Sequence, residues 1–302
     1  MGDPRGSATG EVIPLFPLAT PLFPGIVLPL EIFEPRYRRL VRDLMALPER
    51  SDRRFFGVTA IRQGWEVERV APAAALYDIG CTARLQAVGP RPDGGFRIVT
   101  VGVDRFRLLE VLVGEEPPYL QAEVEWLADE EEAADAAAGR DGLAPFGSVG
   151  GPGADQVAEA VARGSMRVLV GNVRDLFARY VAEVSALRLG WDEPRAGSGA
   201  DDDAPMGDIE DDGIEDDDAE RIGSRTAMLL AEVADDPRAL SYLVASAALL
   251  TPEDRQALLA ISATRRRLAA ESRLLRRELT LLQTLGAVPV PLREFPAPTA
   301  VN

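Results

Sequence analysis

Histidine and lysine are both absent from this chain of 302 residues, and cysteine occurs once, as Cys81. Without histidine there is no His-based acid–base catalysis, no Ser-His-Asp or Cys-His nucleophile pair and no His-ligated zinc. Without lysine there is no Schiff-base chemistry and no P-loop lysine. A single cysteine excludes a disulfide framework and a Cys-rich metal site, and it favours a reducing cytoplasm. We therefore expect no enzyme, no cofactor, and no catalytic or metal site.

Residues 13–30 form an uncharged, apolar stretch, which raises the question of a membrane span or a secretory signal. Five prolines interrupt it: Pro14, Pro17, Pro21, Pro24 and Pro29. Each proline lacks a backbone N–H and would break a helix at a cost of ~3 kcal/mol or more. The preceding residues hold Asp3 and Glu11 beside a lone Arg5, so no basic n-region is present. We expect no membrane anchor.

The negative charge is concentrated in one segment. Residues 192–220 hold fourteen acidic residues and one arginine, a balance of −13, so the rest of the chain carries only −3 of the total of −16. Such a segment buries too little apolar surface to offset its ordering entropy, which predicts a disordered acidic linker over residues 191–221. A calcium loop is not expected there, because Ala219 stands where the bidentate glutamate is needed.

Residues 12–135 have the pattern of a β domain with one helix. Short extended runs at 12–18, 25–33, 54–61 and 81–113 are followed by 119–127, where Leu120, Ala122, Val124 and Trp126 alternate on one face. The turn residues 92–95 (Pro-Asp-Gly-Gly) predict a hairpin. Pro35 predicts the first helical position of a helix that ends at Leu47-Pro48. Its apolar positions are Tyr37, Leu40, Val41, Leu44 and Met45.

The rest of the chain is predicted to be helical, apart from a Gly/Pro-rich linker over residues 136–154. A helical segment over 155–190 precedes the acidic linker, and a helical subdomain over 222–286 follows it. A single long helix is expected to start after Thr251, which has the signature of an N-cap, with Pro252 next. Its apolar stripe comprises Leu258, Ile261, Leu268, Leu275, Leu279 and Leu282. Long helices joined by short turns predict antiparallel packing.

Two ordered sets of motifs resemble one known family. The apolar strand Pro14–Leu18, the turn Leu22–Gly25, and the segment Pro29–Tyr37 with its following helix resemble the opening of the LON substrate-binding domain, the N-terminal region of ATP-dependent Lon proteases. The strand that begins Ile79-Gly80, and the strand at 98–111 with its Gly-x-x-Arg pattern, are similar to later strands of that family. Near the C-terminus, the Gln-x-Leu-Leu of residues 256–259 and the Arg-Leu of residues 267–268 resemble its helical part.

The resemblance implies an α+β fold: an N-terminal PUA-like β-barrel followed by an antiparallel helical subdomain. It also implies a non-catalytic module that recognises unfolded or degron-bearing polypeptides, as an adaptor or chaperone-like factor for a partner protease. Neither ATP hydrolysis nor peptide cleavage carries over, because the P-loop and the Ser-Lys dyad of Lon both need a lysine. We predict a peptide-binding surface at the barrel rim. Its candidate residues are Phe23, Pro24, Phe33, Glu34 and Tyr37.

Two alternatives stay open. PUA-like barrels include RNA-binding proteins, and one basic run is present: Arg265, Arg266, Arg267, Arg273, Arg276 and Arg277. The simplest interpretation of that run is a solvated helix face; it also suits an intramolecular contact with the acidic linker. The chain's negative charge argues against nucleic acid. The other alternative is a structural or regulatory oligomer with the leucine stripe as its seam, and the sequence leaves the oligomeric state unknown.

Overall fold

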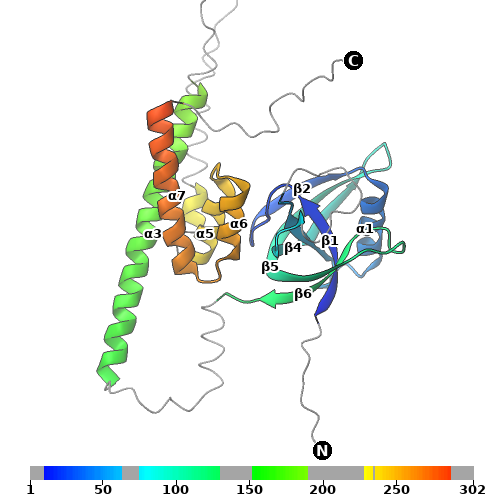
Figure 1. Cartoon of the computed structure of the whole chain (residues 1–302), viewed down its shortest axis with the longest axis horizontal. Helices are drawn as coiled ribbons and strands as arrows, with labels where there is room; N and C mark the ends of the chain where they lie inside the picture. Colours follow the sequence, from blue (N-terminus) through cyan, green and yellow to red (C-terminus); the bar gives the residue numbers. More distant parts are fainter. Residues whose placement is uncertain (1–9, 63–74, 130–151, 190–227, 234, 287–302) are drawn as a thin grey trace, which may run out of the picture.

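A computed structural model describes residues 10–62, 75–129, 152–189, 228–233 and 235–286. Figure 1 shows two parts, a set of strands with one helix and a group of helices beside it. Most of the Gly/Pro linker predicted over 136–154, and all of the acidic linker predicted over 191–221, lie outside the described residues. Both linker assignments therefore stay predictions.

Six strands form one sheet in the order β2-β5-β4-β3-β1-β6. Their bounds are β1 Glu11–Leu18, β2 Val27–Ile32, β3 Phe55–Ala60, β4 Ile79–Pro90, β5 Phe96–Leu112 and β6 Gln121–Leu127. The last strand, β6, also pairs with β5. The pairings of β5, β4, β3, β1 and β6 therefore close into a ring, to which β2 is added along the first half of β5.

The length and irregularity of β5 make this ring possible. The strand spans 17 residues and pairs with β2 through its first part and with β6 through its last part. Register shifts interrupt the β4–β5 and β5–β6 ladders. Such irregularities bend a strand and increase its twist, which lets one strand serve two neighbours in different directions. The mixed α+β class is confirmed, and the PUA-like type stays a prediction.

One helix of the β domain, α1 (Pro35–Ala46), closes one side of its apolar core. Pro35 stands in its first turn and Leu47 follows its end, as predicted. Tyr37, Leu40, Val41 and Leu44 are buried, and the Tyr37 ring stacks on Phe16 with centroids 4.0 Å apart. Met45, expected in the apolar set, is instead exposed, because it lies one position beyond the helix face that meets the strands.

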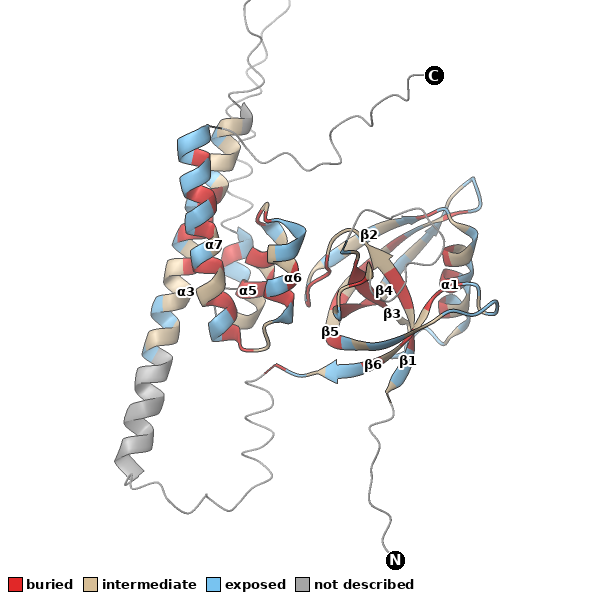
Figure 2. Cartoon of the chain, in the orientation of Figure 1, coloured by how far each residue is buried: buried red, intermediate tan, exposed pale blue. Residues whose placement is uncertain are grey.

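The helical part consists of α3 (Pro152–Leu189), α5 (Pro237–Ala247), α6 (Pro252–Ala260) and α7 (Thr264–Leu285). Thr251 caps α6, as predicted, by accepting a hydrogen bond from the Asp254 backbone N–H at 3.2 Å. The single long helix predicted after Thr251 is wrong, because Ile261 and Ala263 are extended and separate α6 from α7. Figure 2 shows that the buried faces of these helices turn toward one another.

The predicted antiparallel arrangement is also wrong for the largest helix pair. Near the start of the contact, the Asn172 amide donates to the Ser272 hydroxyl at 3.2 Å. Further along both chains, the Gln283 amide donates to the Glu183 carboxylate at 3.2 Å. Residue numbers therefore rise together along α3 and α7, and the two helices are parallel (Figure 1). Two parallel helices need a connection long enough to bring the chain back to the starting end, which a short turn does not provide. Here 74 residues, including α5 and α6, separate the end of α3 from the start of α7.

Candidate functional site

The five predicted rim residues lie in different environments. Phe23, Pro24 and Tyr37 are buried, and Glu34 is partly exposed. The Glu34 carboxylate accepts a hydrogen bond from Nε of Arg36 at 2.8 Å. Phe33 is 66% exposed, which is high for a large aromatic side chain. Of the five, Phe33 and Glu34 reach solvent, and the other three are buried.

Phe23 connects the two parts of the molecule. Its side chain belongs to the apolar core of the helical part, and its ring centroid lies 6.2 Å from that of Tyr242 in α5. The turn that presents it needs two glycines. Gly25 has φ of +77°, and a Cβ at Gly102 would lie 2.1 Å from the Phe23 carbonyl oxygen. The motif at Leu22–Gly25 therefore anchors the strands to the helices.

The exposed apolar surface near Phe33 continues along β2. Side chains alternate between the two faces of a strand, so Val27, Pro29 and Glu31 share the outward face with Phe33 beyond the strand's end. All four are exposed. The side chains between them, Leu28, Leu30 and Ile32, pack on the core of the β domain. We call Val27, Pro29, Glu31 and Phe33 the β2 face.

One edge of β2 has no neighbouring strand among the described residues, because β2 pairs with β5 alone. The Ile26 carbonyl accepts the Gly102 N–H at 2.9 Å, which places the backbone groups of even-numbered residues toward β5. The N–H and C=O groups of Val27 and Glu31 therefore point to the open edge. Pro29 also lies there and has no N–H to offer. A chain that pairs with this edge can form hydrogen bonds to the N–H and C=O groups of Val27 and Glu31, whereas Pro29 between them offers no N–H.

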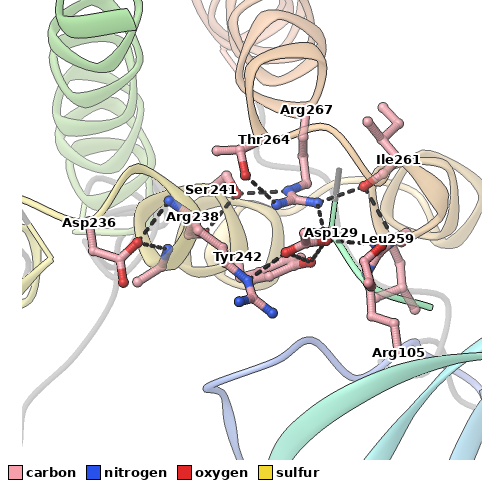
Figure 3. A network of polar contacts seen from close by, with 12 residues as sticks. Arg105, Asp129, Asp236, Arg238, Ser241, Tyr242, Leu259, Ile261, Thr264 and Arg267 are labelled. Atoms are coloured by element: carbon pink, nitrogen blue, oxygen red, sulfur yellow. Dashed lines mark hydrogen bonds and ion pairs between the residues drawn. The ribbon is translucent and has the colours of Figure 1, made fainter. Parts of the chain in front are cut away.

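A buried ionic cluster joins the β domain to the helical part (Figure 3). The Asp129 carboxylate, 1% exposed, accepts from Arg105 of β5 at 2.6 Å and lies 2.5 Å from Nε of Arg238 in α5. The Tyr242 hydroxyl donates to the same carboxylate at 3.2 Å. Burial raises the pKa of Tyr242 to about 12, so the hydroxyl keeps its proton. Asp129 thus has donors from both parts of the molecule.

The same cluster explains the break between α6 and α7. Arg105 donates to the Leu259 carbonyl at 2.9 Å, and Arg267 donates to the Ile261 carbonyl at 2.6 Å. The last carbonyls of a helix lack partners within the helix and carry partial negative charge, so two guanidinium groups satisfy them well. The Arg267 guanidinium also lies over the Tyr242 ring, 3.9 Å from its centroid. We call Arg105, Asp129, Arg238, Tyr242 and Arg267 the interdomain cluster.

The interdomain cluster corrects one prediction. Arg267 belongs to the basic run for which a solvated helix face is the simplest interpretation, yet its side chain is 0% exposed. The sequence did contain a signal, because Arg267 opens the Arg-Leu pair that resembles the family, and Arg105 ends the Gly-x-x-Arg pattern. Composition alone cannot tell such arginines from surface ones, since arginine is usually exposed.

No group of three or more Asp, Glu or Cys side chains within the described residues is placed to hold a metal ion. The thiol of Cys81 is buried, and burial raises its pKa, which disfavours the reactive thiolate. None of the described helices has the length and hydropathy that a membrane span requires. What the geometry does offer is an open strand edge beside an apolar face.

The profile of the ATP-dependent protease La (LON) substrate-binding domain matches residues 12–277. This chain belongs to that family. Lon protease 1 of Herpetosiphon aurantiacus is 26% identical over 274 residues, which cover 90% of this chain and 24% of that protein. The Lon protease of Anaeromyxobacter dehalogenans is 32% identical over 119 residues, covering 39% of this chain and 13% of the relative. The LON-family chain thus spans no more than about a quarter of these relatives.

Solved structures give matches of the same kind. The Lon N-terminal domain protein from Xanthomonas campestris aligns with a TM-score of 0.45 and 19% identity, over 88% of this chain and 98% of the other. The N-terminal domain of the Mycobacterium avium complex Lon protease aligns with a TM-score of 0.43 and 17% identity, over 89% and 98%.

Proposed function

We propose that this LON-family chain is a non-catalytic module that binds unfolded or degron-bearing polypeptides along the open edge of β2. The observation that carries the proposal is the β2 face, an exposed surface of three apolar residues and Glu31 on an edge strand, in a domain of a substrate-binding family. An extended polypeptide that adds to a sheet edge gains main-chain hydrogen bonds, and its alternate side chains contact the adjoining surface. Tyr37 belongs to the apolar core on which the inward side chains of β2 pack.

Pro29 suits such an edge to transient pairing. A long, flat edge with every N–H free is a site of aggregation, and proline interrupts it. Here the interruption leaves Val27 and Glu31 able to pair, so a bound chain makes few main-chain hydrogen bonds and exchanges readily. In the cell we expect a cytoplasmic adaptor or chaperone-like factor that passes polypeptides to a protease partner.

Fluorescence anisotropy with a labelled, permanently unfolded polypeptide tests the proposal. Phe33→Ser is expected to weaken binding by roughly tenfold or more, because a buried Phe side chain contributes about 1.5–3 kcal/mol. Leu285→Ser is the matched control, since Leu285 is 68% exposed on α7, outside the β2 face. Equal loss in the two variants would show non-specific adhesion and would contradict the proposal.

A second pair of variants tests the edge itself. Glu31→Pro removes the N–H that points to the open edge, and Glu31→Ala removes the same side chain but keeps that N–H. We expect Glu31→Pro to weaken polypeptide binding further than Glu31→Ala does. Identical affinities would rule out main-chain pairing at this edge.

The nucleic-acid alternative has less support from the basic run. Arg267 lies in the interdomain cluster, Arg277 pairs with Asp254 at 2.6 Å, and Arg276 donates to Asn172 at 3.3 Å. Labelled single-stranded RNA titrated in the same assay is expected to give no binding at physiological salt, because this module offers phosphates few uncommitted cations.

A further inference from the structure

The ring of strands opens at one end into a pocket of about 260 Å³. Each of the five ring strands contributes to its lining: Glu11 from β1, Phe55 from β3, Arg84 from β4, Asp104 from β5 and Trp126 from β6. Thr82 and the loop before β3 complete it. The β2 edge and the interdomain cluster take no part in this lining.

Strand alternation identifies this pocket as the mouth of the ring. Glu11 lies on the same face of β1 as the buried Ile13, and Trp126 lies on the same face of β6 as the buried Val124. These faces line the interior of the ring, where Phe106 is also buried. At the mouth, the apolar interior residues give way to polar and aromatic ones that reach solvent. Mouths of strand rings are a recurring location of ligand sites.

One wall of the pocket is aromatic and held in position. The rings of Phe55 and Trp126 meet edge to face, with centroids 6.1 Å apart and planes at 71°. The indole N–H of Trp126 donates to the Glu11 carboxylate at 3.1 Å. Two contacts thus fix the indole, which remains 40% exposed. An exposed, oriented indole face is the best partner that proteins offer to a cation.

The charged groups leave one carboxylate uncompensated. Arg53 lies 3.9 Å from Glu11, and Arg84 lies 4.0 Å from Asp52. The third carboxylate, Asp104, forms no ion pair or side-chain hydrogen bond within the described part of the chain, while its backbone N–H donates to the Thr82 hydroxyl at 3.0 Å. The lining therefore carries a net charge of −1, located at Asp104.

We propose that this pocket binds the basic side chain of an arginine or lysine in the polypeptide that the module holds. The guanidinium or ammonium group lies against Trp126 and donates to Asp104, and its aliphatic stem lies along the aromatic wall. The pocket is smaller than the roughly 300–1,000 Å³ of typical small-molecule sites, which suits one side chain better than a cofactor. This inference rests on the proposed function, because it assigns a residue preference to that polypeptide.

Isothermal titration of the whole chain with capped pentapeptides tests the pocket. Gly-Gly-Arg-Gly-Gly is compared with the same peptide carrying citrulline, which has the same shape without the charge, and with one carrying glutamate. We expect roughly millimolar binding of the arginine peptide and at least tenfold weaker binding of the other two. Equal binding of the citrulline peptide, or stronger binding of the glutamate peptide, would overturn the inference.

Variants separate this inference from the proposed function. Asp104→Asn and Trp126→Leu are each expected to weaken arginine-peptide binding at least tenfold. Asp78→Asn is the control, since it makes the same charge change outside the pocket. If the wild-type chain binds unfolded polypeptide but does not bind the arginine peptide, the pocket is refuted and the proposed function stands. Arginine-peptide binding that depends on Asp104, without any binding of unfolded polypeptide, would support the pocket and refute the proposed function.

Discussion

Glu271 gives the sharpest test of the energetics of this fold. It lies on α7 with its side chain 1% exposed, and neither carboxyl oxygen has a hydrogen-bond partner in the described structure. Burial raises the pKa of Glu271 well above its ordinary value, and the charge of nearby Arg267 opposes this only in part. Folding therefore favours the neutral form of this carboxyl group.

The expected gain from Glu271→Met has two parts. Methionine has a similar volume and no polar group, so it removes the cost of about 1–3 kcal/mol for burying an unpaired polar group. The second part depends on pH. Above the unfolded-state pKa of about 4.3, the unfolded chain releases the Glu271 proton while the folded chain keeps it. Wild-type stability then falls, by up to about 1.4 kcal/mol per pH unit, until the pH passes the raised pKa of the folded state.

Urea denaturation followed by circular dichroism, at pH values from about 4.5 to 8, measures both parts. The difference in unfolding free energy between Glu271→Met and wild type is expected to be positive at low pH and to grow as pH rises. Other titrating groups cancel in this difference. Glu271→Gln is expected to show the same pH trend with a smaller offset, because its amide is also unpaired.

The exposed Glu232 supplies the control, and Glu232→Gln is expected to show no such trend. The reasoning is refuted if the difference between Glu271→Met and wild type stays constant over this pH range. A loss of stability in Glu271→Met would have the same meaning, since it would show that an ionised carboxylate stabilises the folded protein.

Two further predictions concern packing. Arg105→Ala is expected to lower the free energy of unfolding by about 3–5 kcal/mol in urea denaturation, because it leaves a buried carboxylate and buried carbonyls with one donor fewer. Arg107→Ala removes one partner of an exposed ion pair and is expected to lower the free energy of unfolding by no more than about 1 kcal/mol. Similar losses in both variants would refute the role of the interdomain cluster. Gly102→Ala is expected to lower the melting temperature, because its Cβ would lie 2.1 Å from a carbonyl oxygen. Gly171→Ala is expected to raise the free energy of unfolding by about 0.5–1 kcal/mol, because Gly171 lies in helix α3 with open space where the Cβ would be. A rise in melting temperature for Gly102→Ala, or a loss of unfolding free energy for Gly171→Ala, would contradict this.

Local sequence determined the element boundaries that depend on local chemistry. Pro35 and Thr251 mark helix starts because a missing N–H or a side-chain oxygen acts on the first turn alone. The turn residues at 92–95 set the β4–β5 hairpin because Gly94 adopts φ of +75°. The buried face of β6 followed from alternation, which is a property of any strand. The family itself was recognisable from short motifs of the same local kind.

Only the tertiary structure decided which residues are buried and which reach solvent. Phe23 and Arg267 look in sequence like a rim residue and a surface arginine, and both are buried because the helical part packs against the strands. The break between α6 and α7 has no glycine or proline to mark it. Its free carbonyls accept from Arg105 of β5, which is distant in sequence, and from Arg267 of α7. The pocket at the mouth of the ring needs one residue from each of five strands, so it exists only when the ring closes. Contacts between segments distant in sequence leave no pattern in either segment alone, so the interdomain cluster and the pocket could not be predicted from local sequence.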